Sequence, residues 1–410
     1  MAIYNYHLFS VIGLEIEYML VDKTSLNIQP CSDLILKILA NDPQDIQNEI
    51  ALGAIAVSNE LVLHVLELKH NGPKALPNID LAHDFQTAIQ QLQPILSDHN
   101  LMLLPTGAHP WMNPHNETKR WPHGNQEIYQ QYDAIFNCKG HGWSNLQSMH
   151  INLPFANDQE FFQLHNAIRL LLPLIPALAA STPFLDSCAT GVRDRRLEYY
   201  GMNQQRISAI TGLVIPEFID SPLQYQQTIL TTMYNAIAPY DPENLLQYEW
   251  LNSRGVIPKF AYGALEIRII DTQECIKADI AIANFIVAIL QNWLMHYDYH
   301  RQNPCPIAPL YQLYQTSIQH GLDACIEDTE LNKQWHINPS IKTAKDALIA
   351  LFITVESMLD HNSKTVIQYI LEKGNLSDRL LAVMGYTPNH AQLHYYYQIL
   401  SSCLINNQQF

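Results

Sequence analysis

Acidic side chains alternate with apolar ones in a short segment near the start of the sequence. Over residues 13–18, Glu15 and Glu17 are flanked by Leu14, Ile16 and Tyr18. Because side chains of a strand point to its two faces in turn, both carboxylates would share one face. Two carboxylates that close repel each other unless water or a cation lies between them. Taken alone, however, the pattern more often indicates a half-exposed strand whose polar face meets solvent.

A second acidic pair, Glu60 and Glu67, lies in the apolar segment 59–68. The two residues are an odd number of positions apart, so an unbroken strand would place them on opposite faces. They can serve one site only if Glu60 lies in the entering loop or a bulge intervenes. A charged Glu67 in an apolar strand is costly unless it is paired, so a buried salt bridge is the alternative. We interpret His64, in the same segment, as a structural histidine.

Two later segments have the same alternation. His150 and Asn152 share one face of a predicted strand, and Glu266 and Arg268 share one face of another. The second pair offers a metal-binding oxygen beside a fixed cation that could meet a phosphate. A structural histidine and an ion pair on a solvated sheet are the respective alternatives.

Together the four segments indicate one site. If a single sheet assembles them, one face packs on helices and the other collects Glu15, Glu17, Glu67 and Glu266. Such a face would be unstable without cations. Hard oxygen ligands without cysteine favour Mg²⁺ or Mn²⁺ over zinc.

The elements that would position these residues mix strands and helices without a regular alternation. This favours an α+β fold over a doubly wound one. Strands are predicted over 10–22, 61–68, 101–104, 149–153 and 263–271, and helices over 33–40, 80–97, 158–180 and 278–297. Pro173 and Pro176 should bend the third helix. Segment 106–127 should be irregular, and the chain beyond residue 304 mostly helical. We predict a catalytic domain over 1–300 and a helical C-terminal region over 301–410 packed on it.

Composition narrows the class of protein. The chain has 410 residues, 48% of them hydrophobic and 15% charged, which is typical of a globular protein. Its net charge of −16 argues against nucleic-acid binding, and a polyphosphate would need divalent cations between it and the carboxylates. The start of the sequence lacks the pattern of a signal peptide, and the longest apolar runs, 170–180 and 278–290, are too short to cross a bilayer. Seven cysteines without a Cys-x-x-Cys pair indicate free thiols and a cytoplasmic protein without membrane contact.

These residues resemble the glutamate–cysteine ligase superfamily, and within it the shorter bacterial carboxylate–amine ligases. Segment 13–20 is similar to the opening Gly-x-Glu-x-Glu strand, 149–152 to the histidine strand, and 265–268 to the Glu-x-Arg strand. Segment 106–111 resembles the Gly-x-His-Pro loop of the short branch, and 180–193 the Ser-x-(Ser/Thr)-Pro region with its arginine. The resemblance runs in order from about residue 13 to 290.

The resemblance implies a glutamine-synthetase-like fold, a curved and largely antiparallel sheet that forms a funnel backed by helices. It implies that two or three Mg²⁺ ions (or Mn²⁺) are held against the phosphates of ATP by Glu15, Glu17, Glu60, Glu67, His150 and Glu266. The residues nearest the chemistry would be Arg268, which would contact the transferred phosphoryl group, with Glu67 and His150. Arg193 would bind a substrate carboxylate, and Arg196 and His109 are further candidates for substrate binding. The density of arginines over 193–196 leaves open which of them meets the substrate.

The implied activity is ATP-dependent ligation of a carboxylate and an amine through an acyl phosphate. The implied pair is the γ-carboxylate of glutamate and cysteine, which gives γ-glutamylcysteine in glutathione biosynthesis. Partners would be small-molecule substrates: ATP, an amino acid carboxylate and an amine. Alternatives are another amine or a protein acceptor, a catalytically silent relative that binds nucleotide, and a metal-dependent hydrolase. The sequence does not indicate an oligomeric state.

Overall fold

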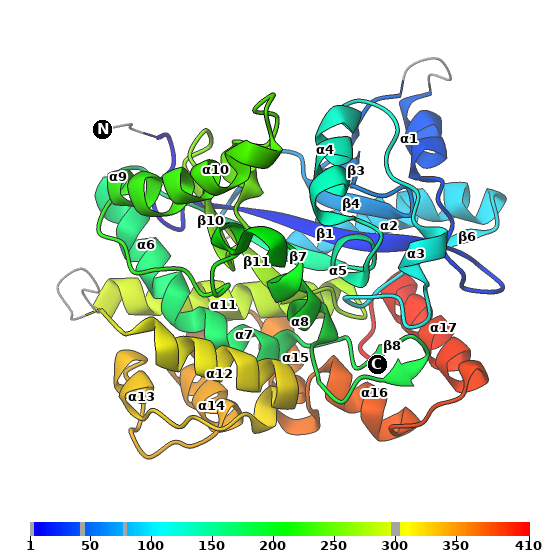
Figure 1. Cartoon of the computed structure of the whole chain (residues 1–410). Coiled ribbons are helices and arrows are strands. Elements are labelled where there is room, and N and C mark those ends of the chain that lie inside the picture. Colours follow the sequence, from blue (N-terminus) through cyan, green and yellow to red (C-terminus); the bar gives the residue numbers. More distant parts are fainter. Residues whose placement is uncertain (1–3, 42–45, 77–79, 297–303) are drawn as a thin grey trace.

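One antiparallel sheet is the centre of the molecule (Figure 1). The computed structural model describes residues 4–41, 46–76, 80–296 and 304–410. The sheet has the order β10-β11-β7-β1-β4-β3-β2, and every pairing among the described strands is antiparallel. The strands are β1 (Val11–Asp22), β2 (Glu49–Leu52), β3 (Ile55–Asn59), β4 (Val65–His70), β7 (Ser148–Pro154), β10 (Val256–Lys259) and β11 (Ala264–Asp271), with β5 (Lys74–Ala75) and β6 (Leu101–Leu104) also paired to β1. The predicted α+β class is confirmed.

Strand β1 organises the sheet because it pairs along both of its edges. Leu14, Ile16 and Tyr18 are at most 1% exposed, and they form the inner side of the strand. The alternating residues Glu15 and Glu17 face the other way, as their spacing predicts. The sheet therefore has one apolar face and one polar face at its centre.

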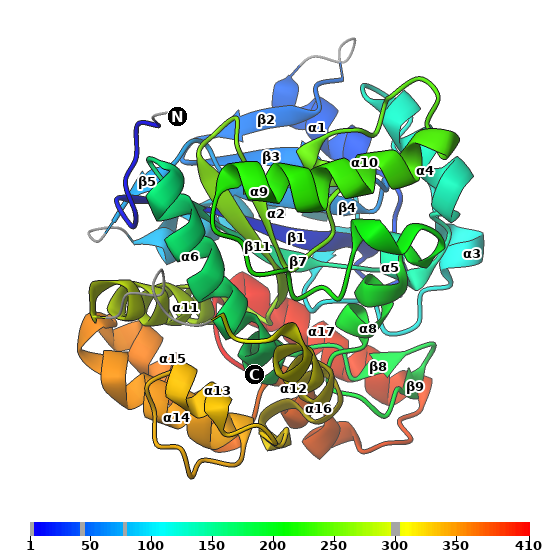
Figure 2. The ribbon, with the colours of Figure 1, turned by 60° about the vertical axis from the view of Figure 1, so that its left-hand side comes forward.

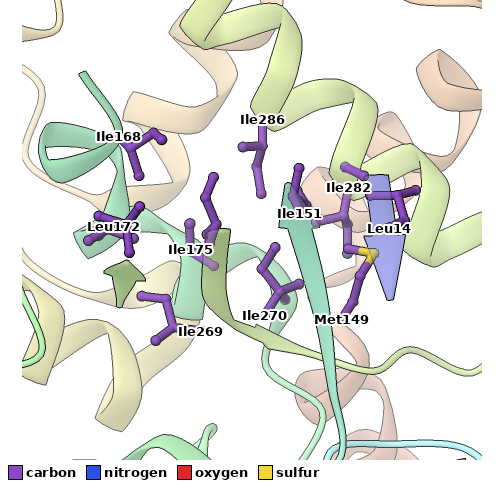
Figure 3. Close-up of a cluster of buried hydrophobic side chains, with 14 of the residues drawn as sticks. Leu14, Met149, Ile151, Ile168, Leu172, Ile175, Ile269, Ile270, Ile282 and Ile286 are labelled. Carbon is purple, nitrogen blue, oxygen red and sulfur yellow. The ribbon is translucent and has the colours of Figure 1, made fainter. Parts of the chain in front are cut away.

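Helices cover the apolar face (Figures 1 and 2). Figure 3 shows Ile282 and Ile286 of α11 (Ile276–His296) beside Leu14 and Ile151 of the sheet. The other helices that precede residue 297 are α1 (Ser32–Ala40), α2 (Leu81–Asp98), α3 (Pro114–Glu117), α4 (Gln126–Phe136), α5 (His141–Ser144), α6 (Asp158–Leu171), α7 (Ile175–Ala179), α8 (Arg195–Met202), α9 (Pro222–Tyr225) and α10 (Thr231–Ile237). The helix predicted over 158–180 is divided between α6 and α7 by a 3₁₀ turn at Leu172–Leu174 that contains Pro173, and Pro176 lies in the first turn of α7.

The two apolar runs of the sequence lie within longer helical stretches, close to the predicted helices. Asp158–Ala179 and Ile276–His296 are long and apolar enough to cross a membrane. Their most apolar windows are 94% and 72% buried inside the protein. Packing against the sheet accounts for their hydrophobicity, as in the core helices of other globular proteins.

The C-terminal helices pack against the body of the molecule and share its two hydrophobic clusters. They are α12 (Ile307–His320), α13 (Glu330–Gln334), α14 (Ala344–Val355), α15 (His361–Lys373), α16 (Leu376–Met384) and α17 (His390–Asn406). The start of α16 is also joined to the body by hydrogen bonds: Asn375 Nδ2 donates to Ala177 O (3.0 Å) and Ser377 N donates to Ala180 O (3.0 Å). The proposed division of the chain near residue 300 stays a prediction.

The strand predicted over 61–68 is wrong in its first half, since β4 begins only at Val65. Residues 61–64 instead bond to the segment before α4: Leu63 N donates to Lys119 O and Trp121 N to Leu61 O (both 2.9 Å). Strands β2, β3 and β10 were not predicted. The last residue of the helix predicted over 278–297 lies outside the described residues.

Candidate active site

Six of the predicted ligands come together as two groups on the polar face of the sheet. Each group offers three ligand atoms that lie within 4.8 Å of one another. The first triad is Glu15, His150 and Glu266, and the second triad is Glu17, Glu60 and Glu67. Oxygen donors with a single imidazole suit Mg²⁺ or Mn²⁺, so the residues present fit the ions that the sequence analysis implied.

Strand register assembles the first triad. Glu15 of β1 pairs with His150 of β7, and Glu266 of β11 pairs with Asn152. The His150 Nδ1 atom lies 3.3 Å from Glu15 Oε2 and 3.9 Å from Glu266 Oε1. Asn152 Nδ2 donates to Glu15 Oε1 (3.0 Å), which fixes that carboxylate from the side.

A β-bulge in β11 adds Arg268 to this group. Ile267 pairs with Ile151 and Ile270 pairs with Met149, so two residues of β11 lie opposite His150 alone. One of them, Arg268, extends on the polar face with its Nε 3.2 Å from Glu266 Oε1. Its Nη1 donates to the Asn252 carbonyl (3.4 Å), which holds the guanidinium in place.

The second triad combines two strands and a loop. Glu17 and Glu67 pair directly across β1 and β4. Glu60 reaches them from the segment between β3 and β4. It therefore lies in the loop that enters the strand, which is one of the two positions from which it could join Glu67 in one site. Ser58 Oγ donates to Glu67 Oε2 (2.7 Å), and Ser148 N donates to Glu17 Oε2 (2.8 Å).

Two lysines on this face were not predicted from the sequence to lie at the site. Lys259, the last residue of β10, has its Nζ 3.2 Å from Glu15 Oε1 and in contact with Glu266 Oε2. Lys69 of β4 has its Nζ 3.0 Å from Glu67 and 2.8 Å from Glu49. An apolar run followed by lysine just before the Glu-x-Arg strand was the only signal for Lys259.

The electrostatics of the two triads differ. Burial alone would raise the pKa of Glu15, but the hydrogen bond to His150 and the charge of Lys259 outweigh it and hold that pKa well below its usual range. In the second triad, burial and the nearby carboxylates Glu67 and Glu17 raise the pKa of Glu60 well above its usual range. Burial, with the charge of Glu15, likewise raises the pKa of Glu67 to about 7. Glu15 of the first triad is thus stabilised in its charged form, whereas in the second triad the charge of Lys69 does not offset burial and the neighbouring carboxylates.

The predicted substrate residues lie apart from the two triads. His109 is fully buried, its Nε2 lies 2.7 Å from Leu26 O, and its Nδ1 accepts from Met112 N (3.1 Å). Burial lowers its pKa to about 4, so the ring is neutral and structural in this arrangement. Arg196 is buried in an ion pair with Asp271, and Arg193 Nε lies 2.5 Å from Asp378 Oδ1 of α16. Substrate contact by these three residues stays a prediction.

A cavity of about 700 Å³ opens beside the first triad. Glu15, Asn152, Lys69 and Lys259 line its inner end, and the tyrosines Tyr6 and Tyr262 line it as well. Tyr262 is 79% exposed, so its ring is free to take a partner. The cavity thus offers aromatic rings and ammonium groups next to a cluster of metal-ligand type.

Helix α4 covers the second triad. The Asn59 side chain, at the end of β3, donates to Tyr129 Oη of α4 (3.4 Å). Burial and the Glu60 carboxylate raise the pKa of Tyr129, which locates this ring beside the triad. The two triads therefore face different surroundings: an open cavity and a helix.

Comparison with known proteins agrees with this geometry. The sequence pattern of glutamate–cysteine ligase family 2 matches residues 11–350, and the chain belongs to this family. An uncharacterized protein of Archaeoglobus fulgidus is 39% identical over 282 residues, which are 68% of this chain and 74% of that protein. A Solibacter usitatus protein, named provisionally as a glutamate–cysteine ligase 2, is 25% identical over 391 residues, 92% of this chain and 89% of its own.

The fold is also found in a solved structure. The glutamate–cysteine ligase of Francisella tularensis in complex with AMP superposes with a TM-score of 0.65 at 12% identity, over 99% of this chain and 90% of that one. The family match extends through the sheet and into α14 and supports a protein of the carboxylate–amine ligase class, and the solved structure shows the same fold.

Proposed function

We propose that the protein is an ATP-dependent carboxylate–amine ligase that joins the γ-carboxylate of glutamate to cysteine. The observation that carries the proposal is the convergence of six metal-ligand side chains in two triads, the first of which lies beside a cavity lined by two lysines. ATP would bind in this cavity, with its base against the tyrosines and its phosphates toward Lys259 and the first triad. The AMP complex of the Francisella tularensis enzyme supports nucleotide binding by this fold.

The chemistry follows from the charges of the reactants. A carboxylate is a poor electrophile, so ATP first converts it to an acyl phosphate, which a neutral amine then attacks with loss of phosphate. Transfer of the phosphoryl group depends mostly on positioning and on neutralising charge. Bound Mg²⁺ would supply part of that neutralisation. Arg268, fixed between Glu266 and the Asn252 carbonyl, is the side chain placed to contact the phosphoryl group in flight.

Glutamate and cysteine are the substrate pair that we propose. The family supports this substrate pair, and a different amine or a protein acceptor is the alternative. Arg193 remains our candidate for the substrate carboxylate. We also propose a cytoplasmic location, which the seven free cysteines support.

The test is release of ADP from Mg·ATP with glutamate plus each member of a panel of amino acids and amines, followed by mass spectrometry. We expect amine-dependent ADP release and a product equal to the two reactants minus water, with cysteine the preferred amine. Absence of ADP release with every pair, from folded and metal-loaded protein, would refute the ligase and favour a regulatory or hydrolytic role.

A further inference from the structure

Lys259 occupies the place in the first triad where a divalent ion would be expected. Its Nζ contacts both Glu15 and Glu266, which are two of the three predicted ligands. Lys69 differs, because it contacts one member of the second triad and the surface carboxylate Glu49. An ammonium group and a metal ion cannot lie between the same two carboxylates at the same time.

The charges of the first triad are already balanced without an ion. Two carboxylates, Glu15 and Glu266, face two cations, Lys259 and Arg268. A divalent ion added alone would have to enter beside both cations. An ion that binds together with phosphate groups brings negative charge with it. The Lys259 ammonium group that the ion displaces from the carboxylates can then pair with the phosphates.

Of the two cations, Lys259 is the one that can move. The guanidinium of Arg268 is held between Glu266 and the Asn252 carbonyl, whereas the Lys259 side chain is 30% exposed and lines the cavity. Lysine is a compact charge on a flexible four-carbon stem, so its head can turn from the carboxylates into the cavity without a change in β10.

We propose that Lys259 is an exchangeable counter-cation of the first triad, which holds Glu15 and Glu266 in the ion-free protein and turns to the phosphates when metal and nucleotide bind. The first triad then takes up its ion only together with a nucleotide. This inference rests on the proposed function for the identity of the nucleotide, but it concerns binding and not turnover.

The experiment counts bound Mn²⁺ by electron paramagnetic resonance on the full chain without nucleotide. We expect Lys259→Met to bind one more Mn²⁺ than the wild type, because the triad is then free. With saturating Mn²⁺, the same variant should bind a non-hydrolysable ATP analogue about tenfold more weakly, since a charged contact with phosphate is lost. Lys259→Arg keeps a cation and should retain the wild-type ion count.

The matched control is Lys74→Met, which removes a strand lysine paired with Asp84 (3.5 Å) outside both triads. It should change neither the ion count nor nucleotide affinity. If Lys259→Met does not fold, as judged by circular dichroism, Lys259→Gln replaces it. An unchanged ion count or an unchanged nucleotide affinity in the folded variant would overturn the proposal. Because neither readout needs turnover, this outcome is distinct from a failure of the ligase assay.

Discussion

The two triads use the same kinds of side chain but reach opposite electrostatic states. In the first, His150, Lys259 and Arg268 surround Glu15 and Glu266, and the pKa of Glu15 is held low. In the second, three carboxylates come together and the pKa values of Glu60 and Glu67 are raised. We propose from this difference that the two triads have two tasks on one sheet, the first meeting nucleotide phosphates and the second a cation.

Removing one carboxylate from each triad should distinguish the roles of the two triads most clearly. Glu15→Gln and Glu67→Gln should each lower ATP turnover by about a hundredfold or more, because each removes stabilisation of charge in the transition state. Only Glu15→Gln should also weaken nucleotide binding, measured by calorimetry with a non-hydrolysable analogue. Equal loss of nucleotide affinity in both variants would remove the distinction between the triads.

The cavity next to the first triad should contribute to nucleotide affinity alone. Tyr262→Ala should weaken ATP binding about tenfold, since stacking of a base on an aromatic ring contributes roughly 1–3 kcal/mol. Turnover at saturating ATP should stay near the wild-type value. Tyr395→Ala, at a 60% exposed position on α17, is the control and should have no effect on either. An unaltered KM for ATP in Tyr262→Ala would place the base elsewhere.

Removing a hydrogen-bond donor beside each triad should distinguish their roles through a smaller effect. Ser58→Ala removes the donor to Glu67, and Asn152→Ala removes the donor to Glu15. Each loss should cost about 1 kcal/mol, or roughly fivefold. We expect this loss as a lower kcat in Ser58→Ala and as a weaker nucleotide affinity in Asn152→Ala. The reverse assignment would contradict the roles given to the two triads.

Lowering the pH should destabilise α5, whose Ser144 carbonyl contacts His64. The ring of His64 donates from Nε2 to Ser144 O of α5 (2.7 Å), and burial lowers its pKa to about 4. An opened His64 titrates near 6.5, so protonation favours opening as the pH falls from about 6.5 toward 4. Hydrogen exchange of residues 141–145, corrected for intrinsic rates, should therefore lose protection over this window while β7 does not.

The control for this measurement is His64→Gln, which keeps a donor but does not titrate. Its protection over 141–145 should depend less on pH than that of the wild type, which separates His64 from the titration of His141 in the same segment. Identical pH profiles would show that His64 does not control this region.

Much of the site could be predicted because a strand has a fixed period of two residues. The alternation around Glu15 and around Glu266 identified both carboxylates and the face they share, before any pairing was known. The motif order then led to the family, which the comparisons confirm.

What escaped prediction depends on pairing between distant segments. Lys69 comes beside the site because it pairs with Glu15 across β1 and β4, and Lys259 because β10 pairs with β11. No local pattern encodes these registers. His109 differs: its motif suggested substrate contact, the fold buries its ring among backbone groups, and its role in substrate binding stays a prediction.

The β-bulge opposite His150 has a consequence for how the sequence can change. Arg268 and the buried Ile269 together occupy the place of one residue in β11. Loss of one of them would leave a regular strand in which Ile270 still pairs with Met149 and Asp271 with Ser148, so the later side chains would keep their faces. Elsewhere in β11 the loss of one residue would turn the later side chains to the other face, including Asp271, which pairs with Arg196. The bulge is therefore the place in this strand where related proteins can differ in length by one residue.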